Sequence, residues 1–157
     1  MTKKVLFVCL GNICRSPAAE AVLLHFLKLK KLEDNFVVDS AGTGGWHVGR
    51  NADQRMQAAA LKRGIKINSK ARQITLNDFD EFDLILTMDD ANLADVNALS
   101  KDLGKPFHAK IKALMSFANN TSVTEVPDPY YGGSSGFDEV LDFLEDAING
   151  LLDEIRN

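Results

Sequence analysis

The chain has 157 residues, 45% of them hydrophobic, which is enough for the core of one domain spanning residues 1–157. A formal net charge of −4 without a long basic run excludes nucleic acid as its main partner. No apolar run is long enough to enter and span a bilayer, and two cysteines are too few for a disulfide framework, so we expect a cytoplasmic protein. The three histidines lie apart, and no metal ion or other cofactor is expected.

The first half of the chain begins with a strand-like apolar run at 5–8. Apolar residues then recur at three- and four-residue spacing, which predicts an amphipathic helix over 17–31 with Glu20 on its polar face. A second short strand is predicted at 36–38. The glycine-rich segment 42–49 that follows predicts an irregular loop.

The second half continues the alternation of helix and strand. Asn51 is predicted to cap a helix that Gly64 stops, and 82–88 is the next strong strand candidate. A helix should start directly after it, 111–115 predicts a weaker fourth strand, and an apolar stripe over 137–155 predicts a long terminal helix. This order implies an α/β fold with a parallel sheet covered on both faces, and ligands at the carboxyl ends of the strands.

The stretch from Cys9 to Pro17, CLGNICRSP, lies where the first strand turns into a helix. Unpaired backbone N–H groups and the helix dipole make such a turn a site for an anion such as phosphate. The same field stabilises a thiolate, so Cys9 is a candidate nucleophile. Arg15 adds a planar fork of donors that can bind two phosphate oxygens together.

Cleavage of a phosphate ester also needs a proton for the leaving oxygen, and the loop itself contains no carboxyl group. The candidates elsewhere in the chain are Asp39, Asp53, Asp89, Asp90 and Asp128. Asp128 has the best local setting, because prolines restrain the backbone on both sides of it, two tyrosines are close in sequence and a glycine pair follows. An aspartate before proline is also a common turn residue, so local sequence alone leaves the choice open.

A cysteine followed by five residues, arginine and serine, between a strand and a helix, is the pattern of cysteine-dependent phosphatases. The fuller string over 8–20, together with DPYYG at 128–132, resembles the low-molecular-weight protein tyrosine phosphatases. Three further features of this chain are similar to landmarks of that family: DSAG at 39–42, Trp46 and ARQI at 71–74. The resemblance covers nearly the whole chain and implies a three-layer sandwich around a four-stranded parallel sheet of strand order 2-1-3-4.

The resemblance also implies a role for each matching residue. Cys9 would form a phosphocysteine, Arg15 would bind phosphate, and Asp128 would act as general acid and then as base. The phosphate cradle would be Leu10, Gly11, Asn12, Ile13, Cys14 and Arg15, with Ser16 and Ser40 as supporting residues and Trp46, Tyr130 and Tyr131 as walls for an aryl ring. Cys14 would be the redox partner of Cys9 in a reversible disulfide. The expected substrates are phosphotyrosine-containing proteins, with inorganic phosphate as a product.

Three alternatives remain open, and one residue departs from the pattern. Thioredoxin-coupled arsenate reductases share the loop but need further cysteines, and none follows Cys14. Protein-arginine phosphatases carry a small polar residue where Ile13 stands. A non-catalytic phosphate or phosphopeptide binder would be expected to lose Cys9 or Asp128. Some relatives of the tyrosine phosphatases have histidine at the position of Ser69, so we expect a difference in the outer part of the network that supports the loop.

Overall fold

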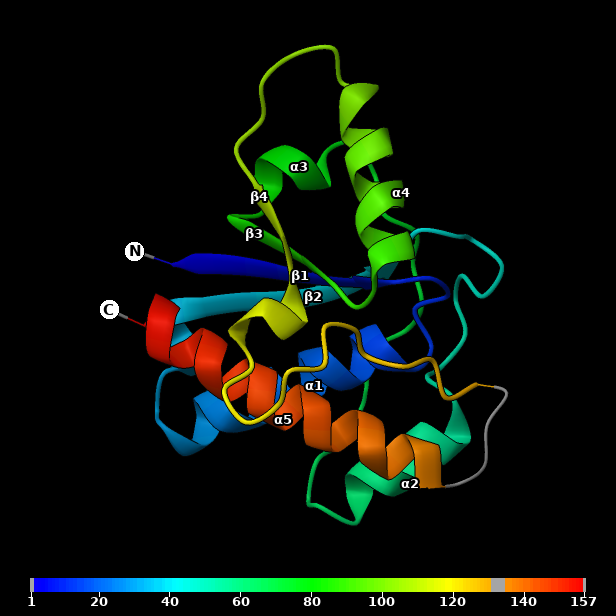
Figure 1. Cartoon of the computed structure of the whole chain (residues 1–157), viewed down its shortest axis with the longest axis vertical. Helices are drawn as coiled ribbons and strands as arrows, with labels where there is room; N and C mark the ends of the chain where they lie inside the picture. Colours follow the sequence, from blue (N-terminus) through cyan, green and yellow to red (C-terminus); the bar gives the residue numbers. More distant parts are fainter. Residues whose placement is uncertain (1, 131–134, 157) are drawn as a thin grey trace.

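The computed structural model describes residues 2–130 and 135–156, in which strands and helices alternate along the chain (Figure 1). The strands are β1 (Lys3–Cys9), β2 (Phe36–Gly42), β3 (Leu84–Thr87) and β4 (Lys110–Ala113). The α-helices are α1 (Arg15–Leu29), α2 (Gln54–Leu61), α3 (Asp78–Glu81), α4 (Asp90–Lys101) and α5 (Ser135–Ile155), and the 3-10 turns are η1 (Glu33–Asn35) and η2 (Leu114–Phe117). No helix in the described part of the chain is both long and apolar enough to cross a membrane.

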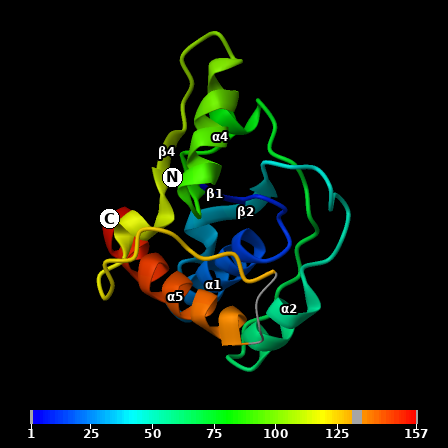
Figure 2. The ribbon, with the colours of Figure 1, turned by 45° about the vertical axis from the view of Figure 1, so that its right-hand side comes forward.

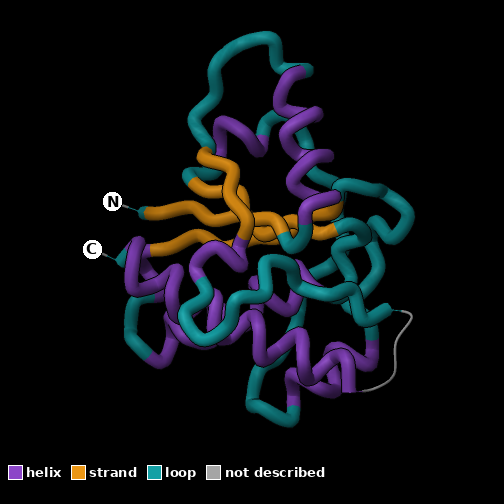
Figure 3. The backbone as a smooth tube through the Cα atoms, viewed as in Figure 1, coloured by secondary structure: helices purple, strands orange, loops and turns teal. Residues whose placement is uncertain are grey.

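The four strands form one parallel sheet in the order β2-β1-β3-β4, which confirms the predicted order. Side chains alternate between the faces of β1. Val5 and Phe7 point into a core shared with α1, α2 and α5, whereas Leu6 and Val8 point into a smaller core shared with α3 and α4. The sheet therefore lies between two helical layers (Figures 2 and 3).

Several element boundaries differ from the sequence prediction. Strand β2 continues to Gly42 instead of ending at residue 38, because it pairs with β1 along its whole length, and β3 covers only Leu84–Thr87 of the predicted 82–88. Helix α1 begins at Arg15 rather than Pro17, and the proline fits inside its first turn because no helical hydrogen bond is needed there. The cap of α2 is Asp53, whose side chain accepts a hydrogen bond from Arg55 N, so the prediction of Asn51 was wrong. The fourth strand ends at Ala113, and the chain then turns into η2.

The carboxyl edge of the sheet brings the loop after β1 together with the segment after β2. Thr43 N donates to Cys9 O at 2.9 Å, and Gly44 N donates to Leu10 O at 2.9 Å. Glycine is needed at position 42, because a Cβ there would lie 2.8 Å from Leu10 O. This close approach places the 43–49 segment beside Cys9.

Candidate active site

Cys9 lies at the end of β1, and its sulfur faces hydrogen-bond donors. The side chain is buried, with Asn12 N donating to Sγ at 3.3 Å and Ser16 Oγ lying 2.9 Å from it. No side chain in the described residues caps the start of α1, so the helix dipole is directed at the loop of residues 10–14. These surroundings suit a thiolate, because donors and a positive dipole end both stabilise negative charge.

Asn12 holds the loop from within. Its φ of 57° is left-handed, a conformation that asparagine adopts more readily than most residues. Its Nδ2 donates to Ser16 Oγ at 2.8 Å and to Ser40 Oγ at 3.0 Å, while its Oδ1 accepts from Arg72 N at 2.9 Å. With Asn12 donating to it, the Ser16 hydroxyl has its own proton for one of two acceptors, Cys9 Sγ at 2.9 Å or Ala41 O at 3.4 Å, and the sulfur is the nearer.

Glu20 extends this network outward, although the sequence pattern placed it on a polar helix face. Ser40 Oγ donates to Glu20 Oε1 at 2.6 Å, and the Ser69 hydroxyl also hydrogen-bonds to the carboxyl group. Burial raises the pKa of Glu20 to about 6, and the Asp39 carboxylate adds to this, whereas the two hydroxyl groups oppose it. Ser69 thus contacts the outer end of the network, where some relatives have histidine.

This shift predicts a pH-dependent effect of replacing Glu20. The pKa is about 6 in the folded protein against an ordinary 4.5, so proton binding stabilises the fold fully below pH 4.5, and this contribution is lost as the pH rises through 6. The loss is about 2 kcal/mol. Glu20→Gln keeps an acceptor for Ser40 but does not titrate. We therefore expect its free energy of unfolding, relative to wild type, to rise by about 2 kcal/mol between pH 4 and pH 7.5.

Urea unfolding of both proteins at the two pH values measures this difference. The exposed Glu33 on η1 supplies the matched control, and Glu33→Gln should show little change with pH. A difference for Glu20→Gln that is the same at both pH values would contradict the prediction.

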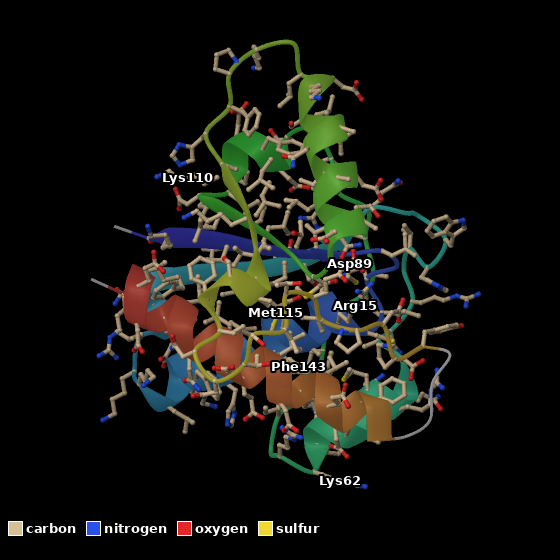
Figure 4. The ribbon with its side chains drawn as sticks, viewed as in Figure 1. Arg15, Lys62, Asp89, Lys110, Met115 and Phe143 are labelled. Atoms are coloured by element: carbon tan, nitrogen blue, oxygen red, sulfur yellow. The ribbon has the colours of Figure 1, made fainter. Side chains whose placement is uncertain are left out.

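Arg15 is buried and its orientation is fixed by two other segments. Its Nη1 donates to Asp89 Oδ2 at 2.6 Å and to Val126 O at 3.0 Å, and Figure 4 shows Arg15 and Asp89 close together. Its Nη2 lies 3.6 Å from Asp128 Oδ2. Because Asp89 and Val126 hold one side of the guanidinium, its remaining donors face the cavity beside Cys9.

Only one of the candidate acids lines the cavity that contains Cys9, and it is Asp128. Three of the other candidates have structural partners: Asp39 pairs with Arg72, Asp53 caps α2, and Asp89 holds Arg15 and caps α4. Asp90 begins α4, and its backbone N–H donates to the Glu125 carboxylate. Burial disfavours the charged form of Asp53, but hydrogen bonds from Arg55 outweigh it and lower the pKa of Asp53. Asp128 is 42% exposed in its side chain.

The cavity has a volume of about 410 Å³. It is lined by Cys9, Leu10, Gly11, Ile13, Cys14, Arg15, Trp46, His47, Asp128 and Tyr130. Three predicted site residues, Asn12, Ser16 and Ser40, are buried behind this lining and connect it to the sheet. Tyr131 lies outside the described residues. The structure therefore brings the predicted nucleophile, arginine, acid and two aromatic residues to one cavity.

The sequence pattern did not indicate two residues that position the cavity wall at Tyr130: His47, which lines the cavity, and Arg55, which does not. The His47 ring packs against the Tyr130 ring with centroids 6.3 Å apart, and it fills the space that a Cβ at Gly11 would need. Arg55 lies over Tyr130, 5.6 Å from the ring centroid, and its Nη2 donates to Tyr130 O at 3.0 Å. Their only sequence signals were a lone histidine beside Trp46 and a basic residue near a helix start.

Cys14 differs from Cys9 in its surroundings. Burial raises the pKa of the Cys14 thiol to about 12, and the nearby charges of Asp53, Cys9 and Asp128 add to this effect. At neutral pH the side chain is therefore a protonated thiol. Among the described residues, no group of three or more His, Cys, Asp or Glu side chains is arranged to hold a metal ion.

The parallel sheet, with a cysteine and an arginine facing one cavity at its carboxyl edge, defines the class of cysteine-dependent phosphatases. A model of the low molecular weight phosphotyrosine protein phosphatase family matches residues 4–157. The family member from Sus scrofa is 42% identical over 156 residues, which are 99% of this chain and 98% of that one. The chain therefore belongs to the low molecular weight phosphotyrosine protein phosphatases.

Solved structures agree with this assignment. A protein tyrosine phosphatase from Entamoeba histolytica superposes with a TM-score of 0.91 at 41% identity, covering 99% of this chain and 97% of that one. An arginine phosphatase from Drosophila superposes with a TM-score of 0.93 at 35% identity, covering 98% of each chain. The same fold thus occurs in proteins named for two substrate classes, tyrosine and arginine phosphatases.

Proposed function

We propose that this chain hydrolyses phosphotyrosine in proteins through a phosphocysteine on Cys9 and releases inorganic phosphate. The observation that carries the proposal is the convergence of Cys9, Arg15 and Asp128 on one cavity with aromatic walls. The cradle for the phosphate is the backbone of residues 10–15 at the start of α1, completed by the Arg15 guanidinium. No metal or cofactor takes part in the proposed steps.

In the first step the Cys9 thiolate attacks phosphorus and the bond from phosphorus to the tyrosine oxygen breaks. Asp128 in its acid form gives its proton to that oxygen. In the structure the Arg15 guanidinium lies 3.6 Å from the Asp128 carboxyl group, so a phosphate group bound by Arg15 lies beside Asp128. Asp128 is therefore close enough to the bound ester to give its proton to the leaving oxygen.

In the second step water attacks the phosphocysteine. Asp128, now a carboxylate, takes the water proton, the bond from sulfur to phosphorus breaks, and inorganic phosphate forms. Cys9 leaves as a thiolate, and the Ser16 hydroxyl at 2.9 Å stabilises it by donating a hydrogen bond.

An aryl substrate fits this cavity best. Cys9 is 3% exposed at its floor, so the phosphate group must be carried inward on a long side chain, and Trp46 and Tyr130 offer flat surfaces for a ring. Ile13 also lines the cavity, as an apolar residue where arginine phosphatases are expected to be polar. Tyr131 remains a further predicted wall.

A panel of peptides of one sequence tests the substrate class. We expect the kcat/KM for phosphotyrosine to exceed that for phosphoserine and phosphoarginine by about 100-fold or more, because only the aryl ester meets both the walls and the depth of the cavity. Arsenate with thioredoxin should not be turned over, since no cysteine follows Cys14. Comparable rates for phosphoarginine would move the chain to the arginine phosphatases.

We also propose that Cys14 protects Cys9 from irreversible oxidation in the cytoplasm. Peroxide converts the Cys9 thiolate to a sulfenic acid. The Cys14 thiol then forms a disulfide with Cys9, and the sulfenic oxygen leaves as water with the thiol proton. Both residues line the same cavity, which supports the pairing.

Treatment with limited peroxide should therefore inactivate the enzyme reversibly. Mass spectrometry should find Cys9 linked to Cys14, and dithiothreitol should restore hydrolysis. In Cys14→Ser the same treatment should give Cys9 sulfinate or sulfonate and permanent inactivation. Irreversible oxidation of Cys9 in the wild type at the same dose would reject a protective role for Cys14.

A further inference from the structure

A second hollow adjoins the catalytic cavity. Its volume is about 480 Å³, and it shares Leu10 and Trp46 with the catalytic cavity, so these two residues form the ridge between them. Both ridge residues are large exposed hydrophobics, Leu10 at 42% and Trp46 at 70%. The Trp46 ring lies against the backbone of Gly44, where a Cβ would come within 1.8 Å of Cζ3. The Trp46 side of the ridge therefore packs on the backbone although it is exposed.

The far wall of this hollow is one face of helix α4. Asp95, Leu99 and Asp102 are spaced at i, i+4 and i+7, which places them on the same side of the helix. Ile74 adds apolar surface. We call this hollow, with its apolar surface and two carboxylates, the α4 groove. In Figure 1 the segment that follows β2 passes beside the lower half of α4.

The charge of the α4 groove is negative and uncompensated. In the residues that the structure describes, no Lys, Arg or His nitrogen lies within 4.0 Å of the carboxylate of Asp95 or Asp102, and the groove lining contains no basic residue. Asp102 stands at the carboxyl end of α4, where the helix dipole disfavours negative charge. Its charge therefore does not serve the stability of the helix.

We propose that the α4 groove binds a lysine or arginine side chain of the same polypeptide that presents the phosphotyrosine. This rests on the proposed function, which places the phosphotyrosine on the other side of the ridge. An extended peptide advances about 3.3 Å per residue, so a segment crossing Leu10 and Trp46 brings a nearby side chain over the groove. The methylene stem of a basic residue packs on Leu99 and Ile74, while its charged end reaches the carboxylates.

The proposal predicts a salt-sensitive preference for a basic residue near the phosphotyrosine. Exposed ion pairs are weak individually, so two carboxylates should give roughly a three- to tenfold preference in kcat/KM. The preference should fall in high salt, because screening weakens exposed pairs. An acidic residue at the same position should be disfavoured.

The experiment uses phosphotyrosine peptides with lysine, alanine or glutamate at each position from two to five residues before or after the phosphotyrosine. The kcat/KM of each is measured for wild type and for the double variant Asp95→Asn/Asp102→Asn, in low and high salt. Asp34→Asn/Asp153→Asn, two exposed aspartates away from the groove, is the matched control. We expect wild type and control to prefer lysine at one position, and the double variant to lose that preference.

A second variant, Asp95→Lys/Asp102→Lys, should reverse the preference to glutamate at the same position. Hydrolysis of p-nitrophenyl phosphate, which does not reach the groove, should be unchanged in all variants and shows that they fold. The proposal for the α4 groove would be overturned if the wild type showed no lysine preference at any position. It would also be overturned if both variants at Asp95 and Asp102 kept that preference. Either result would leave the proposed function intact. Failure of the wild type on every phosphotyrosine substrate would instead overturn the proposed function.

Discussion

The Cys9→Ser variant should lose hydrolysis of every phosphate ester, with kcat/KM reduced on the order of 10⁴-fold or more. A serine hydroxyl is not ionised at neutral pH, because an alcohol is a much weaker acid than a thiol. Serine is therefore a far poorer nucleophile at this position. Phosphate binding should persist in part, because the backbone of residues 10–15 and the Arg15 guanidinium form the proposed cradle.

Steady-state kinetics with phosphotyrosine and calorimetric titration with inorganic phosphate measure the two effects separately. Cys14→Ser is the matched control, since it replaces the other cysteine of the loop with the same residue. The Cys14 thiol, with a pKa of about 12, is protonated at neutral pH, so this control should keep most of its hydrolysis. Turnover by Cys9→Ser close to that of the control would exclude the phosphocysteine mechanism.

The Asp128→Ala variant should separate esters by the acidity of their leaving groups. For phosphotyrosine we expect kcat/KM to fall by about 10²- to 10⁴-fold, the usual contribution of a general acid. For 2,4-dinitrophenyl phosphate the loss should be small, because that leaving group departs without a proton. The comparison uses kcat/KM, which reports the steps up to formation of the phosphocysteine and so excludes the later base role of Asp128.

Asp89→Asn gives the contrasting pattern. Asp89 holds Arg15 at 2.6 Å and does not line the cavity, so weakening this pair should slow both esters by a similar factor. The ratio of the two kcat/KM values should then stay near that of wild type. If Asp128→Ala also slows both esters equally, the proton donor must be another group.

Much of the fold could be predicted from local sequence. The strands β1 and β3 are apolar throughout because they lie buried in the middle of the sheet, and α5 has an apolar stripe because one of its faces packs into the same core. All three elements were expected. The errors fell at boundaries. Asn51 and Asp53 are both good helix caps, and the choice of Asp53 followed from its hydrogen bonds with Arg55 rather than from capping propensity.

Glu20 was misjudged for a related reason. Residues in a helix are assigned to a polar face when they are charged, yet the start of α1 is enclosed by the sheet and by the 69–72 segment. A carboxyl group there is acceptable because Ser40 and Ser69 hydrogen-bond to it. Periodicity carries no information on such partners, which come from distant parts of the chain.

The sequence by itself determined the alternation of strands and helices, the CLGNICRSP loop at a strand-to-helix turn and a small set of candidate proton donors. These features depend on neighbouring residues. Only the tertiary structure decided which acid reaches the cavity, since Asp128 and Cys9 are 119 positions apart in the chain and meet solely through folding. The same holds for His47 over Gly11, Asp89 on Arg15 and the α4 groove beside Trp46. Contacts between distant segments depend on how layers pack, and no local pattern encodes them.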